Sequence, residues 1–355
     1  MKHAFKIIDL LLPFGWLYGL ITGVRNRLFD SGMLKSVKFN IPVISIGNIT
    51  VGGTGKTPHT EYIASLLKDS MKTAVLSRGY GRRTKGFILA GSGSDSSTIG
   101  DEPLQIKNRF PDLDVAVCED RVYGIRRLMD SCSPQVVILD DAFQHRRVTP
   151  SLNILLVNWH RDIMSDTMLP AGRLRESAKG RRRAQIIIVT KCPEDMTQDS
   201  MDRIDARLRT GESQQIYFST LEYGDTYPIG MPDNVTAIPS SKVLAVTGIA
   251  SPGLLEAHLK SQGCQVTLMI YPDHHNFRER DIRNIAAKLQ SMGDDTSIIT
   301  TAKDAARLTG MEIDGNLRKR IFVLPVGIRF LRDAEKFESA IREHVESFRK
   351  QQETT

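Results

Sequence analysis

The sequence contains little cysteine: four residues in a chain of 355, at positions 118, 132, 192 and 264. Structural zinc sites and disulfide frameworks need cysteines at short or paired spacings, and these four lie far apart. This argues against a disulfide-stapled extracellular domain. We expect structural thiols in a reducing compartment.

The sequence also lacks a hydrophobic run long enough to span a bilayer, which takes about 20 apolar residues in succession. The run at residues 7–24, IIDLLLPFGWLYGLITGV, is interrupted by Asp9 and Pro13 and has basic residues on both sides. No small-x-small cleavage site follows it, so we expect no removed signal peptide. The run fits a helix lying in an anionic membrane surface. The alternative is a first helix packed on the protein's own core.

Basic stretches interleaved with aromatic residues are absent as well. The formal net charge of +7 favours an anionic partner, which by charge alone is nucleic acid, a lipid surface or a phosphorylated substrate. Single-strand binding proteins combine basic grooves with stacking aromatic side chains, so we expect no nucleic acid among the partners. The 41% hydrophobic and 25% charged content are those of a globular protein, and the length suggests about two domains.

Short β-branched runs alternate with helical patterns along most of the chain. Strands are predicted at residues 43–46, 73–76, 115–117, 136–139, 154–157, 186–189 and 216–219, with helices such as 57–68 and 121–130 between them. This alternation predicts an α/β fold with a doubly wound, mainly parallel sheet like that of P-loop NTPases. We expect a larger domain at residues 1–223, a linker at 224–241 and a smaller α/β domain at 242–355 that ends in a charged helix.

A phosphate-binding loop is predicted where the first strand ends, in the sequence IGNITVGGTGKTP. Thr50 replaces the first glycine of the usual Gly-x-x-x-x-Gly-Lys-Ser/Thr pattern. Glycines let backbone N–H groups surround phosphate oxygens at a helix N-terminus. Lys56 would neutralise the β- and γ-phosphates, and Thr57 would hold Mg²⁺. The expected nucleotide-binding residues are Thr50, Val51, Gly52, Gly53, Thr54, Gly55, Lys56 and Thr57.

Two carboxylates, Asp140 and Asp141, follow a buried apolar strand. At the carboxyl end of a parallel strand they would face the ligand crevice and help to hold the metal. The sequence Thr190-Lys191-Cys192-Pro193 is similar to a guanine-reading motif, but proline cannot accept the donors of guanine. ATP is therefore the expected nucleotide.

Further polar motifs point to the acceptor of the phosphate. Arg78 and Arg82 lie on a glycine-rich turn, SRGYGRR, that suits a phosphate-bearing ligand. Asp101 and Glu102 stand at an expected helix start, where an acidic cap is the plain explanation. The histidine pair in DHH, residues 273–275, has no third ligand nearby and makes a poor zinc site.

Eight motifs in order carry a resemblance to a known family. They are GNITVGGTGKTP, LSRGYGR, GDEP, ILDDAFQHRR, LPAGRLRE, VTGIASP, YPDHHNF and TAKDAARL, and they extend over residues 47–308. Together they resemble the tetraacyldisaccharide 4'-kinase family, in which the loop has the form GNxxxGGxGKT. Thr50 is therefore no anomaly within that family.

The resemblance implies a peripheral kinase on the cytoplasmic face of the bacterial inner membrane. Such an enzyme uses ATP and Mg²⁺ to phosphorylate the 4'-hydroxyl of an acylated glucosamine disaccharide 1-phosphate, giving lipid IVA. It implies Asp101 as catalytic aspartate, assisted by His274 or else by His275. Glu102, Asp140 and Asp141 would then organise metal and phosphates.

The resemblance also implies a ligand for the basic residues. Arg173 and Arg175 begin a basic run that ends at residue 183. This run would hold the substrate's 1-phosphate or an anionic leaflet, unless it is only a solvated face. Arg78, Arg82 and His275 are the other expected substrate-binding residues.

Other protein classes share some of these motifs. A membrane-associated P-loop ATPase that acts as a switch would hydrolyse ATP without a lipid product, but such proteins need no second domain with a DHH motif. A phosphoesterase named for that motif would need further aspartate motifs upstream, where this chain has an ATP loop instead.

Overall fold

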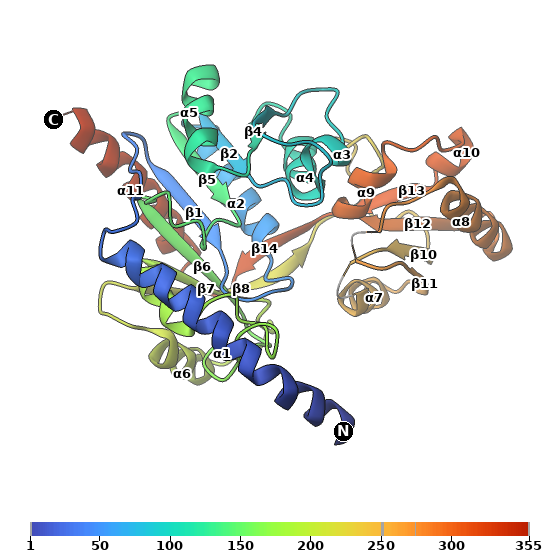
Figure 1. Ribbon diagram of the computed structural model, residues 1–355. Coiled ribbons are helices and arrows are strands. Elements are labelled where there is room, and N and C mark those ends of the chain that lie inside the picture. The colour runs from blue at the N-terminus through green and yellow to red at the C-terminus, as the bar shows by residue number, and fades with distance from the viewer. Residues whose placement is uncertain (1, 250–251, 274, 354–355) are drawn as a thin grey trace.

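The computed structural model describes residues 2–249, 252–273 and 275–353, and it contains two sheets of mainly parallel strands (Figure 1). The larger sheet has nine strands in the order β14-β8-β7-β6-β1-β5-β2-β4-β3, and the smaller has five in the order β11-β10-β12-β13-β9. Helices accompany both sheets. The predicted doubly wound α/β fold with a second, smaller α/β unit is confirmed.

The larger sheet contains every strand predicted for the first domain. Its strands are β1 (Val43–Gly47), β2 (Thr73–Ser77), β3 (Ile88–Leu89), β4 (Asp114–Val117), β5 (Val136–Asp140), β6 (Leu152–Asn158), β7 (Ile186–Thr190), β8 (Gln215–Tyr223) and β14 (Val326–Phe330). Every residue of β1, β2, β5 and β7 is buried, because both faces of the sheet are covered. This double burial explains why these strands are continuous apolar runs in the sequence.

The larger unit has one helix before its first strand, and its other helices up to β8 lie between strands. They are α1 (Lys2–Asp30), α2 (Lys56–Lys68), α3 (Ser96–Ile99), α4 (Asp101–Arg109), α5 (Arg121–Cys132), α6 (Gln198–Leu208) and a 3₁₀ helix at Ala178–Arg183. All four cysteines are free thiols. Cys118, Cys132 and Cys192 are buried, and Cys264 is half-buried.

The smaller unit lies to one side of the larger sheet (Figure 1). Its strands are β9 (Tyr227–Pro228), β10 (Lys242–Thr247), β11 (Gln265–Ile270), β12 (Thr296–Thr301) and β13 (Ile321–Leu324), and its helices are α7 (Pro252–Ser261), α8 (Glu279–Met292), α9 (Ala302–Leu308) and α10 (Gly315–Arg318). Strand β9 lies inside the expected linker, yet it pairs with β13 as part of the smaller sheet.

The end of the chain returns to the larger unit. Strand β14 pairs antiparallel with β8, and α11 (Ala334–Glu353) buries Phe337, Ile341 and Val345 in the core of the larger sheet. These three residues are spaced by four, which places them on one face of the helix. The sequence-based limits assigned residues 242–355 to the smaller domain. Strand pairing and packing instead join residues 326–353 to the larger one.

Helix α1 lies on the surface of the larger unit, and its N-terminal end extends beyond it (Figure 1). Gly15 and Gly19 allow close approach, since a Cβ on Gly15 would lie 3.1 Å from the backbone oxygen of Met168. Asn26 continues this contact by donating to Glu176 over 3.1 Å. Large apolar side chains on the rest of the helix are exposed, namely Leu10, Phe14, Trp16, Leu17, Leu20, Ile21 and Val24. No helix in the described ranges is both long and apolar enough to cross a membrane.

Substitution of Phe337 tests the packing of α11 against the larger sheet. Its ring is fully buried, 4.5 Å from the Phe330 ring centroid and 5.2 Å from that of Tyr217. We expect Phe337→Ala to lower the free energy of unfolding by about 3–5 kcal/mol, because it removes a core ring and leaves a cavity. Denaturant unfolding measures this, with the exposed Glu343→Ala on the same helix as control. Equal stability of the two variants would contradict the packing described here.

Candidate active site

The loop between β1 and α2 has the backbone shape that a phosphate site needs. Gly52 and Gly55 have φ values of 96° and 79°, in the region that favours glycine. A Cβ on Gly52 would also lie 2.6 Å from a terminal nitrogen of Arg161. Lys56 begins α2 directly after Gly55. The loop therefore ends at a helix N-terminus, where backbone N–H groups and the helix dipole favour an anion.

Thr50 differs from the usual glycine because this part of the loop is strand-like. It forms an antiparallel bridge with Leu174 and is buried. On either side, the Val51 N–H donates to the Arg173 oxygen and the Arg175 N–H donates to the Ile49 oxygen, each over 2.8 Å. The LPAGRLRE motif thus supplies a backbone template for the loop, and an extended β-branched residue suits this position.

Side chains from neighbouring strands fix the rest of the loop. Thr54 is fully buried, where its hydroxyl accepts a bond of 2.7 Å from Asn48 and its carbonyl accepts one of 2.9 Å from Thr190. The carbonyl of Gly53 accepts from Asn158 over 3.3 Å, and that of Val51 accepts from Arg161 over 2.6 Å. Because these carbonyls are bound by side chains around the loop, its conformation is established without a nucleotide.

Two carboxylates lie beside the loop in different electrostatic settings. Asp140 is buried and accepts from the hydroxyls of Thr60 and Ser77 over 3.1 and 3.2 Å. Its burial, reinforced by the charge of Asp141, raises the pKa of Asp140 to about 6.

Asp141 is the charged member of the pair. It lies 3.6 Å from the Lys56 ammonium and 3.0 Å from the Arg175 guanidinium. Burial would raise the pKa of Asp141, but the charges of these two cations outweigh it, so the pKa lies below its usual value. Lys56, the expected phosphate-binding cation, is thus held by a carboxylate beside the loop.

Mg²⁺ fits this group of residues. The carboxylate oxygens of Asp140 and Asp141 are hard donors of the kind that Mg²⁺ prefers, and Thr57 adds a hydroxyl at the start of α2. Within the described part of the chain, no group of three or more His, Cys, Asp or Glu side chains could hold a metal by itself.

Asp101 begins α4 and faces the smaller unit. Its Oδ2 lies 2.6 Å from Nη2 of Arg307 on α9, and Glu102 lies 3.5 Å from the Lys303 ammonium on the same helix. The cap residue of α4 is Gly100, so the carboxylate of Asp101 follows the cap. The GDEP motif therefore meets TAKDAARL where the two units touch.

The expected histidines are placed only in part. His274 lies outside the described residues. His275 is stacked on Tyr271 with ring centroids 4.7 Å apart, and its Nε2 lies 2.9 Å from a carboxylate oxygen of Asp281. That carboxylate also accepts from the backbone N–H of Arg278 at the start of α8. The ring of His275 is therefore engaged with α8, and its expected role in the reaction remains a prediction.

The expected substrate arginines fall into two groups. Arg78 and Arg173 have exposed side chains on the surface. Arg175 pairs with Asp141, and Arg82 is almost fully buried, bound to Glu119 and to the Gly86 carbonyl over 2.6 Å each. Arg82 therefore closes its own glycine-rich turn, and its role in substrate binding stays a prediction that this contact does not favour.

Two of the basic residues that follow Arg175 have structural partners. Arg183 pairs with the buried Glu176 over 2.8 Å and lies over the ring of Phe143. Arg181 donates to the backbone oxygens of Leu208 and Ala178. Lys179 and Arg182 in the same run are exposed, so the expected role of the run in holding a phosphate or an anionic leaflet stays a prediction.

Several residues of the site were not predicted. Arg307 and Lys303 belong to the TAKDAARL motif, whose sequence alone indicates no role for either residue. Arg161 and Lys191 lie beside the loop, and burial, with a contribution from Arg161, lowers the pKa of Lys191. No sequence pattern marks Arg161. Lys191 follows a predicted strand, and its sequence context resembles only a guanine-reading motif.

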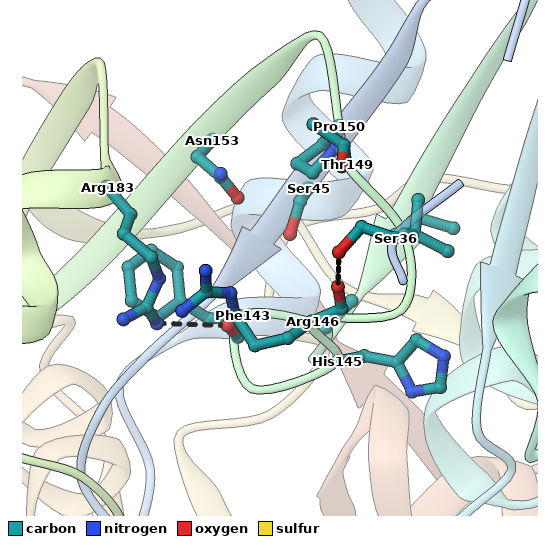
Figure 2. A pocket seen from close by; sticks show the side chains of 12 residues that line it. Ser36, Ser45, Phe143, His145, Arg146, Thr149, Pro150, Asn153 and Arg183 are labelled. Carbon is teal, nitrogen blue, oxygen red and sulfur yellow. Dashed lines mark hydrogen bonds between the residues drawn. The ribbon is translucent and has the colours of Figure 1, made fainter. Parts of the chain in front are cut away.

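Two cavities lie away from the loop. One, of about 140 Å³, is bordered by Ser45, Asn153, Arg146 and Arg183 on the face of β1 that is opposite α2 (Figure 2). Ser45 Oγ and Arg146 Nη1 have no hydrogen-bond partner among the described residues, and a polar space of this size can hold ordered water. The other, of about 440 Å³, opens beside Tyr223 and His258.

Comparison with known proteins decides the family. The family model described as Tetraacyldisaccharide-1-P 4'-kinase matches residues 7–346. The chain belongs to this family. A Bacteroides fragilis protein named tetraacyldisaccharide 4'-kinase is 46% identical over 346 residues, covering 94% of this chain and 92% of that protein. A Flavobacterium johnsoniae protein of the same name is 41% identical over 339 residues, covering 95% of this chain and 96% of the other.

A solved structure agrees with this family membership. It is described as the "apo" form of LpxK from Aquifex aeolicus in complex with ATP. The two folds superpose with a TM-score of 0.76 at 30% identity, covering 96% of this chain and 99% of that one. This chain is therefore a kinase of the tetraacyldisaccharide 4'-kinase family, and the alternatives of a switch ATPase and a phosphoesterase are set aside.

Asp140 gives this kinase a testable pH dependence. In the nucleotide-free protein its pKa of about 6 lies above the ordinary value of 3.8. Ionisation at pH 8 therefore costs the folded state free energy. This cost begins to fall as the pH drops through 6 and is lost only below the ordinary pKa of 3.8. We expect Asp140→Asn to raise the free energy of unfolding at pH 8 by about 1–3 kcal/mol while lowering activity, and the gain to vanish below about pH 4.

Denaturant unfolding at both pH values provides the measurement. Asp233→Asn, at an exposed position, is the control and should change neither value. A destabilised Asp140→Asn protein at pH 8 would mean that the hydroxyl donors of Thr60 and Ser77 stabilise the carboxylate more than burial penalises it.

Proposed function

We propose that this chain transfers the γ-phosphate of ATP to the 4'-hydroxyl of tetraacyldisaccharide 1-phosphate, giving lipid IVA in lipid A biosynthesis. The observation that carries the proposal is the meeting of two groups of residues in one molecule. A preformed phosphate loop has Lys56 at its end, and a carboxylate at Asp101 lies where the second unit contacts the first. Nearly full-length similarity to kinases named for this reaction supports the choice of acceptor.

Each side of the loop has a task in binding ATP. Backbone N–H groups between Val51 and Thr57 bind the phosphate oxygens, and Lys56 turns from Asp141 toward the β- and γ-phosphates. Thr57, Glu102, Asp140 and Asp141 are the residues that would hold Mg²⁺. When bound, this ion neutralises charge on the phosphates.

Asp101 is proposed to accept the proton of the sugar hydroxyl. An alcohol is a poor nucleophile, so a positioned base must take its proton as the new bond forms. His274 is proposed to assist, with His275 as the alternative. Since this histidine pair belongs to the smaller unit, the groups proposed to react with the substrate come from both units.

Lys56 provides the test of phosphate transfer. Purified protein with Mg-ATP and the disaccharide 1-phosphate should yield a product heavier by one phosphate group, detected by mass spectrometry. We expect Lys56→Ala to lower this turnover by about 10²-fold or more, because a cation at the transferring group is lost. Lys68→Ala, at the exposed end of the same helix, should keep normal turnover. Near-normal turnover in folded Lys56→Ala protein would end the assignment.

We also propose that α1 holds the protein on an anionic membrane surface, on the cytoplasmic face of the inner membrane. Trp16 and Leu10 are 75% and 73% exposed. Contact of such large apolar side chains with water is unfavourable, and exposed apolar surface of this kind marks a site of interaction with a membrane or another protein. A helix with apolar side chains toward lipid and basic residues among headgroups binds at the interface without spanning it. The same surface would admit the acyl chains of the substrate.

Vesicle binding tests this role of α1. Trp16→Ser with Leu20→Ser removes two apolar side chains, each worth about 1.5–3 kcal/mol when buried in lipid. We expect binding to anionic vesicles to weaken more than tenfold in co-sedimentation, and activity to fall more on the acylated substrate than on a short-chain analogue. Met231→Ser, which alters an exposed side chain elsewhere, is the control. Unchanged vesicle binding with equal losses on both substrates would favour a purely structural helix.

A further inference from the structure

Arg307 crosses from the smaller unit into the site of the larger one. It belongs to α9, and its side chain is 2% exposed although it lies between two units. Its Nη2 donates to Oδ2 of Asp101 over 2.6 Å. A charge-assisted bond this short fixes the direction of both groups.

A second carboxylate holds Arg307 from its own side. Asp304, one turn earlier on α9, is fully buried, and its Oδ1 accepts from Nη1 of Arg307 over 3.2 Å. Its Oδ2 accepts from the Thr247 hydroxyl over 2.9 Å, from the Gly248 N–H over 3.0 Å and from the Thr301 hydroxyl over 2.8 Å. Asp304 thereby fastens α9 to the ends of β10 and β12, and the guanidinium is supported by the body of the smaller sheet.

Geometry explains why arginine stands at this position. The planar guanidinium presents several donors in a fixed arrangement, so one side chain bridges Asp304 and Asp101 with different nitrogens. A lysine ammonium is a single point charge and cannot reproduce both directions. Buried pairs of this kind are poor evidence for stability, since desolvation offsets their attraction. Their more specific effect is to fix geometry.

We propose that Arg307 is a positioning residue for phosphate transfer: it orients the Asp101 carboxylate, so that this base has its working geometry only when the smaller unit is in contact with α4. The inference rests on the proposed role of Asp101 as base. With Oδ2 bound to Arg307, rotation of the carboxylate is restricted, and the direction of its other oxygen is defined. The parallel pair of Lys303 and Glu102 steadies the same contact.

Two other roles of Arg307 would have different consequences. If Arg307 contacted the transferring phosphate itself, its loss would add to the loss of Asp101. If the pair were only structural, its loss would lower stability without a matching change in turnover. Positioning predicts a selective fall in kcat that disappears once Asp101 is no longer a base.

The experiment measures kcat, the KM for ATP and the melting temperature of Arg307→Met and Arg307→Lys in the full-length enzyme. We expect kcat to fall about 10²-fold in Arg307→Met, the cost of misplacing a reacting group by roughly an ångström, with the KM for ATP unchanged. Arg307→Lys should fold and give an intermediate kcat. In a third variant, Arg307→Ala, guanidinium added to the solution should raise kcat by replacing the missing group. Arg283→Met, at an exposed arginine of α8, is the matched control.

A double-mutant comparison with Asp101→Asn completes the test. We expect Arg307→Met to have no further effect on the residual turnover of Asp101→Asn. Multiplicative losses would overturn the proposal in favour of contact with phosphate, and normal kcat in folded Arg307→Met or Arg307→Lys would overturn it outright. A fully active Asp101→Asn enzyme would remove the base assignment and the inference together. If the Arg307 variants keep normal kcat while Asp101→Asn is inactive, the proposal for Arg307 fails and the assignment of Asp101 as base stands.

Discussion

The register of β1 against β5 is the constraint on which the site depends. In this parallel pair Ile46 lies opposite Asp140, so both strands end at the same edge of the sheet. The chain that leaves β1 becomes the phosphate loop, and the chain that leaves β5 carries Asp141. A shift of one residue would turn the buried side chains of a strand to its other face. Burial on both faces of these strands therefore fixes the loop and the carboxylates relative to each other.

The loop itself depends on segments far away in the sequence. Residues 173–175 pair with the backbone of the loop, and the hydroxyl of Thr190, at the end of β7, donates to the carbonyl of Thr54. Such supports hold the glycine-rich backbone in one conformation before any ligand arrives. That conformation matters for phosphate transfer, because preorganised donors need no rearrangement during the reaction.

Much of the fold was predictable from the sequence, since parallel strands covered on both faces are short apolar runs between turns. The loop and the acidic strand end were equally visible, because their spacing follows from local backbone geometry. The return of α11 was not. Its stripe of Phe337, Ile341 and Val345 shows that the helix buries one face, but a stripe does not say which core receives it. Arg307 was missed for the same reason: its partner Asp101 is 206 residues away in the chain.

The pairing of β8 with β14 determines how the two units are joined. The chain leaves the larger sheet after Tyr223 and re-enters it at Val326, and the Gly224 N–H donates to the Pro325 oxygen over 3.1 Å. The two ends of the smaller unit therefore lie side by side. In topological terms the whole unit is the loop of a single edge hairpin, inserted into a nucleotide-binding sheet whose strand order is complete without it. The bend and twist of this one two-stranded ribbon therefore help to set how closely α9 approaches α4.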